Sequence, residues 1–143
     1  MPRISLAKAN RMIAAGFAKA REQGFKPLGM AVLDAGGHLI AFQKQDGTSM
    51  MRFEIAAGKA YAALATGVGS RAVGKLAAER PHFFVGLSGV SGGKMVPVPG
   101  GALVKTRSGE IIGAVGVTGD TSDNDEIAAI AGIEAAGFVA DPG

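Results

Sequence analysis

Apolar residues recur at helical spacing near the start of the chain. The positions, three or four residues apart, are Leu6, Ala9, Ile13 and Phe17. Such spacing places all of them on one side of a helix. Ser5 is a suitable N-cap residue before the stripe, and Gly24 can end the helix after it. The pattern predicts a helix over residues 5–23.

Short apolar runs bounded by turn residues predict strands. Residues 28–33 and 38–43 flank the sequence DAGG, which supplies the turn residues of a hairpin. Residues 101–105 and 111–117 form a second pair around RSGE. A further apolar run, 83–87, is predicted as a strand as well. The sheet should therefore have about five strands.

Three more helices are predicted, over residues 50–66, 70–79 and 122–136. The helix at 50–66 is rich in alanine and contains Gly58. Small side chains let another backbone come close, so this helix should be buried or lie at an interface. Strands joined mostly by hairpins form a mainly antiparallel sheet with helices packed against it. We therefore expect an α+β fold in one domain, residues 1–143.

Composition narrows the function classes. Hydrophobic residues make up 48% of the chain and charged residues 19%, as in globular proteins. Without cysteine there is no disulfide, thiolate nucleophile or cysteine-type zinc site. The net charge of +3 is spread along a chain with only 6% aromatic residues, which argues against nucleic-acid binding. No apolar run is long enough for a membrane span or a signal peptide, so we expect a cytoplasmic protein without membrane partners.

Glycine-rich segments resemble phosphate-binding loops but have the wrong spacing. The segment GVGSRAVG at 67–74 lacks the G-x-G-x-x-G pattern and follows a helix instead of a strand. In GVSGGK at 89–94, the first glycine of a P-loop is replaced by Ser88, and Met95 stands where serine or threonine belongs. Both segments are expected to be loops.

The segment GVTGDTSDNDE at 116–126 concentrates acidic and amide side chains. It fails as a calcium-binding EF-hand because Asp125 replaces the required glycine and Ala131 replaces the final glutamate. No histidine lies nearby, so no metal site is predicted. Acidic side chains suit the N-terminus of the following helix, where they cap free N–H groups and face the helix dipole. Capping needs only one or two of them, which leaves room for a carboxylate that faces a ligand.

Three basic side chains are candidates for ligand contacts. Arg52 and Lys59 are seven residues apart on an otherwise apolar helix and project to a similar side. They could anchor a carboxylate, or their stems could pack while their charges reach solvent. His82 lies in an apolar setting that could suit an axial ligand of haem, but a packed or surface histidine is the simpler interpretation.

Several segments, in order, resemble the GlcG/HbpS family. They are FEIAAGKA at 53–60, VPVPGG at 96–101, GEIIGAVGVTGD at 109–120 and DEIA at 125–128. The V-x-D-x-x-G hairpin at 32–37 and the opening helix fit the same order, so the resemblance covers nearly the whole chain. It implies a profilin-like α+β domain that forms homo-oligomers. It also relates the chain to the C-terminal domain of PduO-type cobalamin adenosyltransferases.

The resemblance implies site residues position by position. Lys59, the paired glycines Gly100 and Gly101, and the acidic pair Asp125 and Glu126 match the family pattern. The expected ligand-binding residues are Arg52, Lys59, Pro99, Gly100, Gly101 and Asp125. They should surround a pocket formed by the second helix, the VPVPGG segment and the GDTSDNDE segment. The stretch 120–124 is longer than in the haem-binding members, a departure that argues against haem.

Two functions follow. The first is a small-molecule-binding protein with haem as the candidate cofactor, since the family includes haem-binding proteins. The second is implied by a branch of the same family that is similar to lyases: an enzyme on a small aromatic carboxylate such as 4-hydroxylaminobenzoate. Glu126 or Asp120 would then be the general acid/base. No nucleophile–base pair is visible in the sequence. A structural subunit without a ligand is the third and least favoured alternative.

Overall fold

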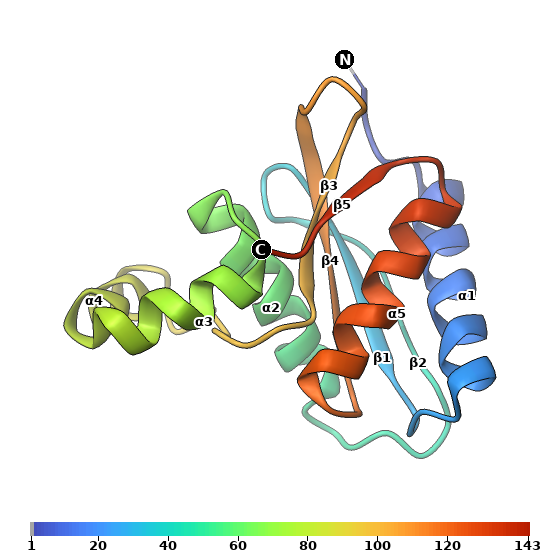
Figure 1. Cartoon of the computed structure of the whole chain (residues 1–143), viewed down its shortest axis with the longest axis horizontal. Helices are drawn as coiled ribbons and strands as arrows, with labels where there is room; N and C mark the ends of the chain where they lie inside the picture. The colour runs from blue at the N-terminus through green and yellow to red at the C-terminus, as the bar shows by residue number, and fades with distance from the viewer. Residues whose placement is uncertain (1) are drawn as a thin grey trace.

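The computed structural model describes residues 2–143 and shows one five-stranded sheet with helices on both faces (Figure 1). The helices are α1 (Leu6–Gln23), α2 (Arg52–Thr66), α3 (Ser70–Glu79), α4 (Pro81–Val90) and α5 (Ser122–Ala135). The strands are β1 (Gly29–Asp34), β2 (Leu39–Lys44), β3 (Gly101–Lys105), β4 (Ile111–Thr118) and β5 (Val139–Asp141). The predicted α+β fold is confirmed.

The sheet has the strand order β2-β1-β4-β3-β5, and every neighbouring pair is antiparallel. Hairpins connect β1 to β2 and β3 to β4, as predicted. The two hairpins join in the middle of the sheet, where β1 pairs with β4 from Gly29 opposite Thr118 to Asp34 opposite Gly113. β4 is therefore a central strand, and all of it except its first residue is buried.

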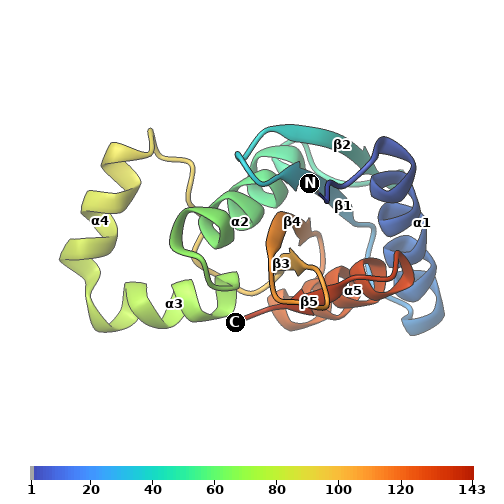
Figure 2. The same ribbon diagram turned by 90° about the horizontal axis from the view of Figure 1, so that it is seen from above.

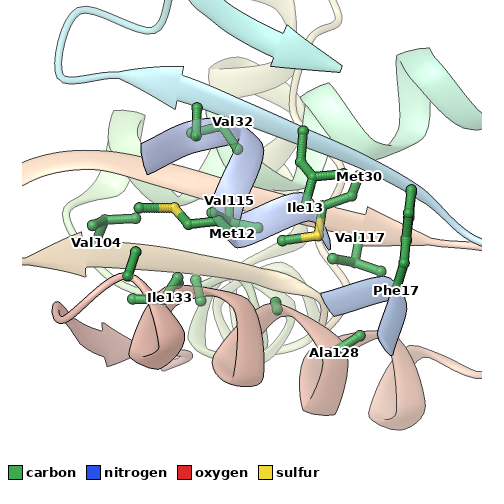
Figure 3. Close-up of a cluster of buried hydrophobic side chains, with 14 of the residues drawn as sticks. Met12, Ile13, Phe17, Met30, Val32, Val104, Val115, Val117, Ala128 and Ile133 are labelled. Carbon is green, nitrogen blue, oxygen red and sulfur yellow. The ribbon is translucent and has the colours of Figure 1, made fainter. Parts of the chain in front are cut away.

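Helices α1 and α5 cover one face of the sheet. Between them and the strands lies the main core, with Met12, Ile13 and Ile133 from the helices and Met30 and Val115 from the strands (Figure 3). The Ser5 hydroxyl accepts the Lys8 N–H at 3.1 Å at the start of α1, and Gly24 ends that helix with a φ of 70°. Both caps were predicted from the sequence.

Helix α2 covers the opposite face and lies very close to the strands. A Cβ atom added at Gly116 of β4 would come within 1.8 Å of the Ala56 carbonyl oxygen on α2. The smaller core on this face contains Ala60 and Ala63 of α2 with Leu33 and Leu103 of the sheet. The small side chains expected to allow a close approach therefore face the sheet.

Helices α3 and α4 extend away from the sheet as an arm, and α4 lies at its far end (Figure 2). The prediction of a strand at 83–87 was wrong, because this run lies inside α4. Pro81 occupies the first turn of the helix, where proline is favoured. Phe84 and Leu87, three residues apart, pack toward Val73 and Met95, which helical spacing allows and a strand would not.

Two further observations complete the fold. The short strand β5, which was not predicted, pairs with β3 at the edge of the sheet. Among residues 2–143, no helix is long and apolar enough to cross a membrane.

Candidate functional site

Lys59 is a buried lysine on α2. Its Nζ atom donates hydrogen bonds to the Val117 carbonyl oxygen at 2.9 Å and to Asp125 Oδ2 at 3.0 Å. The side chains of Lys59 and Asp125 are each only 2% exposed. Because Asp125 belongs to α5, this ion pair connects the helix on one face of the sheet with a helix on the other face.

Burial disfavours the charged form of both Lys59 and Asp125. Burial lowers the pKa of Lys59, and the nearby Asp125 carboxylate works against that shift. Burial likewise raises the pKa of Asp125, while Lys59 and the Asp120 N–H, which donates to Asp125 Oδ1 at 2.9 Å, lower it. Each charge is therefore held in place by the other and by main-chain hydrogen bonds.

Gly100 and Gly101 make room for the lysine. A Cβ atom at Gly100, whose φ is 119°, would lie 2.9 Å from Lys59 Nζ and 2.7 Å from the Val117 oxygen. At Gly101 it would lie 2.3 Å from the Lys59 carbonyl oxygen. The Gly101 N–H donates to the Ser70 hydroxyl at 2.7 Å, which itself donates to the Val98 carbonyl at 2.6 Å. The paired glycines thus let the chain pass directly over Lys59, and Pro99 leads into them half-buried.

Arg52 begins α2 near the same end of the sheet. Its Nη1 donates to Thr118 Oγ1 at 2.8 Å, and its charge contributes to the lowered pKa of Lys59. Arg52 and Lys59 thus bind neighbouring residues at the end of β4, Thr118 and Val117, and Asp125 pairs with Lys59. Binding of a ligand carboxylate by these cations stays a prediction.

Asp120 is held by its own loop. Its carboxylate accepts hydrogen bonds from the Lys26 N–H at 2.7 Å, the Thr121 N–H at 2.8 Å and the Asn124 side-chain amide at 2.8 Å. These bonds, the one from Lys26 foremost, lower the pKa of Asp120. A carboxylate so stabilised in its charged form is poorly suited to donate a proton. The N-cap of α5 is Thr121, whose hydroxyl accepts the Asn124 N–H.

Glu126 is paired on a different surface. Arg71 of α3 binds both carboxylate oxygens of Glu126, at 3.1 and 3.0 Å, and it also contacts Asp123. These contacts raise the pKa of Arg71. Three acidic side chains that the sequence grouped together therefore have separate partners: the Lys26 main-chain N–H for Asp120, the Lys59 side chain for Asp125 and the Arg71 side chain for Glu126.

The main pocket lies away from the Lys59–Asp125 pair. A cavity of about 500 Å³ lies between α2, the β1–β2 hairpin and the segment after α4. Its lining residues are Leu33, Gly37, Leu39, Met51, Phe53, Glu54, Ile55, Ala57, Gly58, Tyr61, Gly93, Lys94 and Val96. The walls are mostly apolar. Lys94 Nζ lies 5.5 Å from the centre of the Tyr61 ring.

The cavity differs from the pocket expected from the sequence. Helix α2 and Val96 of the VPVPGG segment line it, but the acidic segment 120–126 does not. None of the residues proposed from the sequence is part of the lining. The available signal was the apolar series Phe53, Ala57 and Tyr61, four residues apart on α2, with Met51 just before the helix.

Neither His82 nor a metal-binding cluster contributes to the cavity among the residues that the structure describes. His82 is exposed on α4. Within residues 2–143, no group of three or more histidine, aspartate or glutamate side chains is arranged to hold a metal ion.

Comparison with known proteins decides the family. The model of the family described as "Haem degrading protein HbpS-like" matches residues 4–134. The chain belongs to the HbpS-like family. This confirms the resemblance seen in its sequence motifs.

Relatives of the HbpS-like chain match it over most of its length. An uncharacterised 15.0 kDa protein from the dhaT–dhaS intergenic region of Citrobacter freundii is 32% identical over 126 residues, which are 88% of this chain and 87% of the relative. The crystal structure of Klebsiella pneumoniae protein ORFY has a TM-score of 0.85 at 27% identity, covering 96% of this chain and 93% of that one.

A third structure is PduOC, solved as a complex with haem. It has a TM-score of 0.84 at 22% identity and covers 96% of this chain and 97% of its own. At that identity the likeness establishes the shared fold alone.

Proposed function

We propose that this HbpS-like protein binds a flat, mainly apolar small molecule in the cavity beside α2. The observation that carries the proposal is the cavity itself, about 500 Å³ in volume and lined by Met51, Phe53 and Tyr61. Pockets for small ligands span roughly 300–1,000 Å³ and combine apolar walls with a few polar groups. Here Lys94 and Glu54 are the charged lining residues.

Haem is the candidate ligand, and the residues of the cavity fit it. A phenol and a thioether are side chains that ligate haem iron in other proteins, and Tyr61 and Met51 supply them. The Lys94 ammonium would suit a carboxylate at the edge of the ligand. The family description, a haem-degrading protein, supports the same ligand. When bound, haem would supply iron redox chemistry, while the chain would supply apolar walls and a cation.

The test is a haemin titration of the purified protein, followed in the Soret region. Saturable binding near one haemin per chain is expected. Ala57→Leu places a larger side chain in the cavity and should weaken binding at least about tenfold. Ala65→Leu is the matched control, because Ala65 lies on the same helix, is exposed and does not line the cavity.

Two outcomes would count against the proposal. If micromolar haemin causes no Soret change, haem is not the ligand. Iron-free protoporphyrin is then the next molecule to test in the apolar cavity. Equal haemin affinity in Ala57→Leu and Ala65→Leu places binding elsewhere on the molecule.

The lyase alternative stays a prediction without support from the geometry. Its proposed acid/base groups lie outside the cavity lining: Asp120 accepts the Lys26 main-chain N–H, and Glu126 is bound by the Arg71 side chain. Turnover of 4-hydroxylaminobenzoate that is abolished by Glu126→Gln would revive it. Equal turnover in wild type and variant would exclude Glu126 as the acid/base group.

A further inference from the structure

A second cavity, of about 440 Å³, lies toward the start of β4, whereas the Val117 carbonyl that binds Lys59 lies near its end. Its walls are the turn between β1 and β2, the start of β4 and the segment before α1, which passes beside β1 and β2 (Figure 2). Its volume lies within the range of roughly 300–1,000 Å³ that pockets for small ligands span. No residue lines both this cavity and the one beside α2, so the two are separate.

Three isoleucines form the apolar part of the second cavity. Ile4 and Ile112 belong to the main core, and Ile40 packs against it. Ile4 also anchors the segment before α1 on the sheet, because its Cδ1 atom lies 2.5 Å from the place that a Cβ atom at Gly113 would take. The apolar wall is therefore part of the packed fold, and an apolar group of a ligand would extend the core outward.

Asp34, at the end of β1, contributes a carboxylate with one free oxygen. Its Oδ1 atom accepts the Gly36 N–H at 2.9 Å and the His38 N–H at 3.0 Å, and it lies 3.4 Å from His38 Nδ1. Among residues 2–143, no hydrogen bond reaches Oδ2. The hydrogen bond from the His38 N–H is the main cause that lowers the pKa of Asp34, so the carboxylate is charged at neutral pH. Oδ2 is free to accept hydrogen bonds from a cationic group.

Arg3 brings the opposite charge to the same cavity. It is exposed, and within the described part of the chain it has no ion-pair partner. Arg3 and Asp34 thus line one cavity without pairing with each other. A guanidinium can bind a carboxylate through two parallel hydrogen bonds. The cavity therefore offers one site for an anionic group and one for a cationic group beside an apolar wall.

We propose that this second cavity binds a free α-amino acid with an apolar side chain. The carboxylate of the ligand contacts Arg3, its ammonium contacts Asp34 Oδ2, and its side chain packs on the three isoleucines. A ligand with only a carboxylate would face the Asp34 charge without a cation of its own, and an amine would face Arg3 in the same way. A zwitterion satisfies both charges at once. The site needs no haem and does not rest on the proposed function.

Leucine is the probe, and equilibrium dialysis with labelled leucine measures its binding. Saturable binding near one leucine per chain is expected. Two competitors keep the carbon skeleton of leucine but lose one charged group: isocaproate lacks the ammonium and isopentylamine lacks the carboxylate. Each should compete at least about tenfold more weakly than unlabelled leucine, because it leaves one charged residue of the cavity without a partner. Competition by either analogue as strong as that by leucine would overturn the assignment of an amino acid.

Substitution of Arg3 tests the site of the carboxylate. Arg3→Gln should weaken leucine binding at least about tenfold, since glutamine cannot form a charged pair of hydrogen bonds. Arg107→Gln is the matched control, because Arg107 is also exposed and without an ion pair among residues 2–143, but does not line the cavity. Equal leucine affinity in the two variants would place the carboxylate elsewhere and overturn the proposal.

Substitution of Asp34 tests the site of the ammonium. Asp34→Asn removes the charge, but the asparagine Oδ1 can still accept the Gly36 and His38 N–H groups and keep the turn. Leucine binding should again weaken at least about tenfold. Asp46→Asn, at an exposed aspartate outside the cavity, makes the same charge change and should bind leucine like wild type. Equal affinity in the two variants contradicts the role of Asp34.

These results are separable from haem binding. Leucine binding without haemin binding upholds this site and rejects haem. Haemin binding by a protein that retains no leucine at about 10 mM rejects this site and leaves the proposed function intact. Arg3→Gln should leave the haemin affinity unchanged, because Arg3 does not line the cavity beside α2.

Discussion

Lys59 Nζ lies 3.0 Å from Asp125 Oδ2, and water reaches neither side chain to any extent. The two residues are 66 positions apart and belong to helices on opposite faces of the sheet. Removing one partner of a buried ion pair leaves an uncompensated charge, whereas removing both is often tolerated. The pair therefore predicts different outcomes for single and double substitutions.

Lys59→Met should destabilise the protein by about 3–5 kcal/mol, because it leaves the Asp125 carboxylate buried without its cation. Lys59→Met/Asp125→Asn should recover a substantial part of that loss, since asparagine is neutral and its Oδ1 can still accept the Asp120 N–H. Urea unfolding of both variants measures the difference. A double variant no more stable than Lys59→Met would show that charge is not the cause.

Gly100→Ala should lower the free energy of unfolding by roughly 2–5 kcal/mol, which combines backbone strain with a clash against Lys59 Nζ and the Val117 oxygen. Gly109→Ala is the matched control. Gly109 also has a positive φ, 92°, but open space around it, so strain alone should cost about 1–2 kcal/mol. Equal losses in thermal or urea unfolding would remove the close approach of Lys59 from the explanation.

Asp120→Asn should destabilise the protein at neutral pH but much less in acid. The hydrogen bonds from Lys26, Thr121 and Asn124 lower the pKa of Asp120 below its ordinary 3.8. Their contribution is fully present above pH 3.8 and is lost as the pH falls through the lower pKa of the folded state. Loss of charge-assisted hydrogen bonds predicts roughly 1–2 kcal/mol at pH 7.

The control for this pH dependence is Asp46→Asn, which makes the same charge change at an exposed aspartate. Unfolding free energies from pH 7 down to pH 3 should converge for wild type and Asp120→Asn, and should stay nearly parallel for wild type and Asp46→Asn. If Asp120→Asn is less stable than wild type by the same free energy at every pH in this range, the Asp120 carboxylate charge is not the source of the stabilisation.

Two glycines between α1 and α5 should differ in their tolerance of alanine. A Cβ atom at Gly132 would lie 2.5 Å from the Met12 carbonyl oxygen, which is backbone and cannot move alone. At Gly16 the nearest atom, at 2.6 Å, is the sulfur of Met30, on a flexible side chain that can adjust. Gly132→Ala should cost roughly 1–3 kcal/mol, and Gly16→Ala clearly less. The reverse order in urea unfolding would show that the helices repack.

Local patterns predicted most of the fold. The stripe Leu6, Ala9, Ile13 and Phe17 identified α1, and the turn sequences DAGG and RSGE identified two hairpins. Predictions failed where tertiary contacts decide. Phe84 is helical because it packs with Leu87 toward Met95, and β5 is a strand only because β3 offers it an edge. The three residues of β5 are too few to show the alternation of apolar and polar side chains that identifies a strand in a sequence.

The site was only partly predictable for a similar reason. Lys59 and Asp125 were each identified by their own motif, but their contact depends on the path of the 66 residues that separate them. The cavity was missed because Met51, Phe53 and Tyr61 resemble ordinary core residues on a helix. Only the spatial arrangement shows that no other part of residues 2–143 fills the space beside them.

The central pairing of β1 with β4 has a consequence for synthesis on the ribosome. β1 is complete at Asp34, but the strand that covers its second edge begins at Ile111, more than seventy residues later. The nascent chain must therefore keep an apolar strand with one open edge until β4 has emerged. Such an edge can pair with other chains, so slow translation between β2 and β4 should favour aggregation over folding.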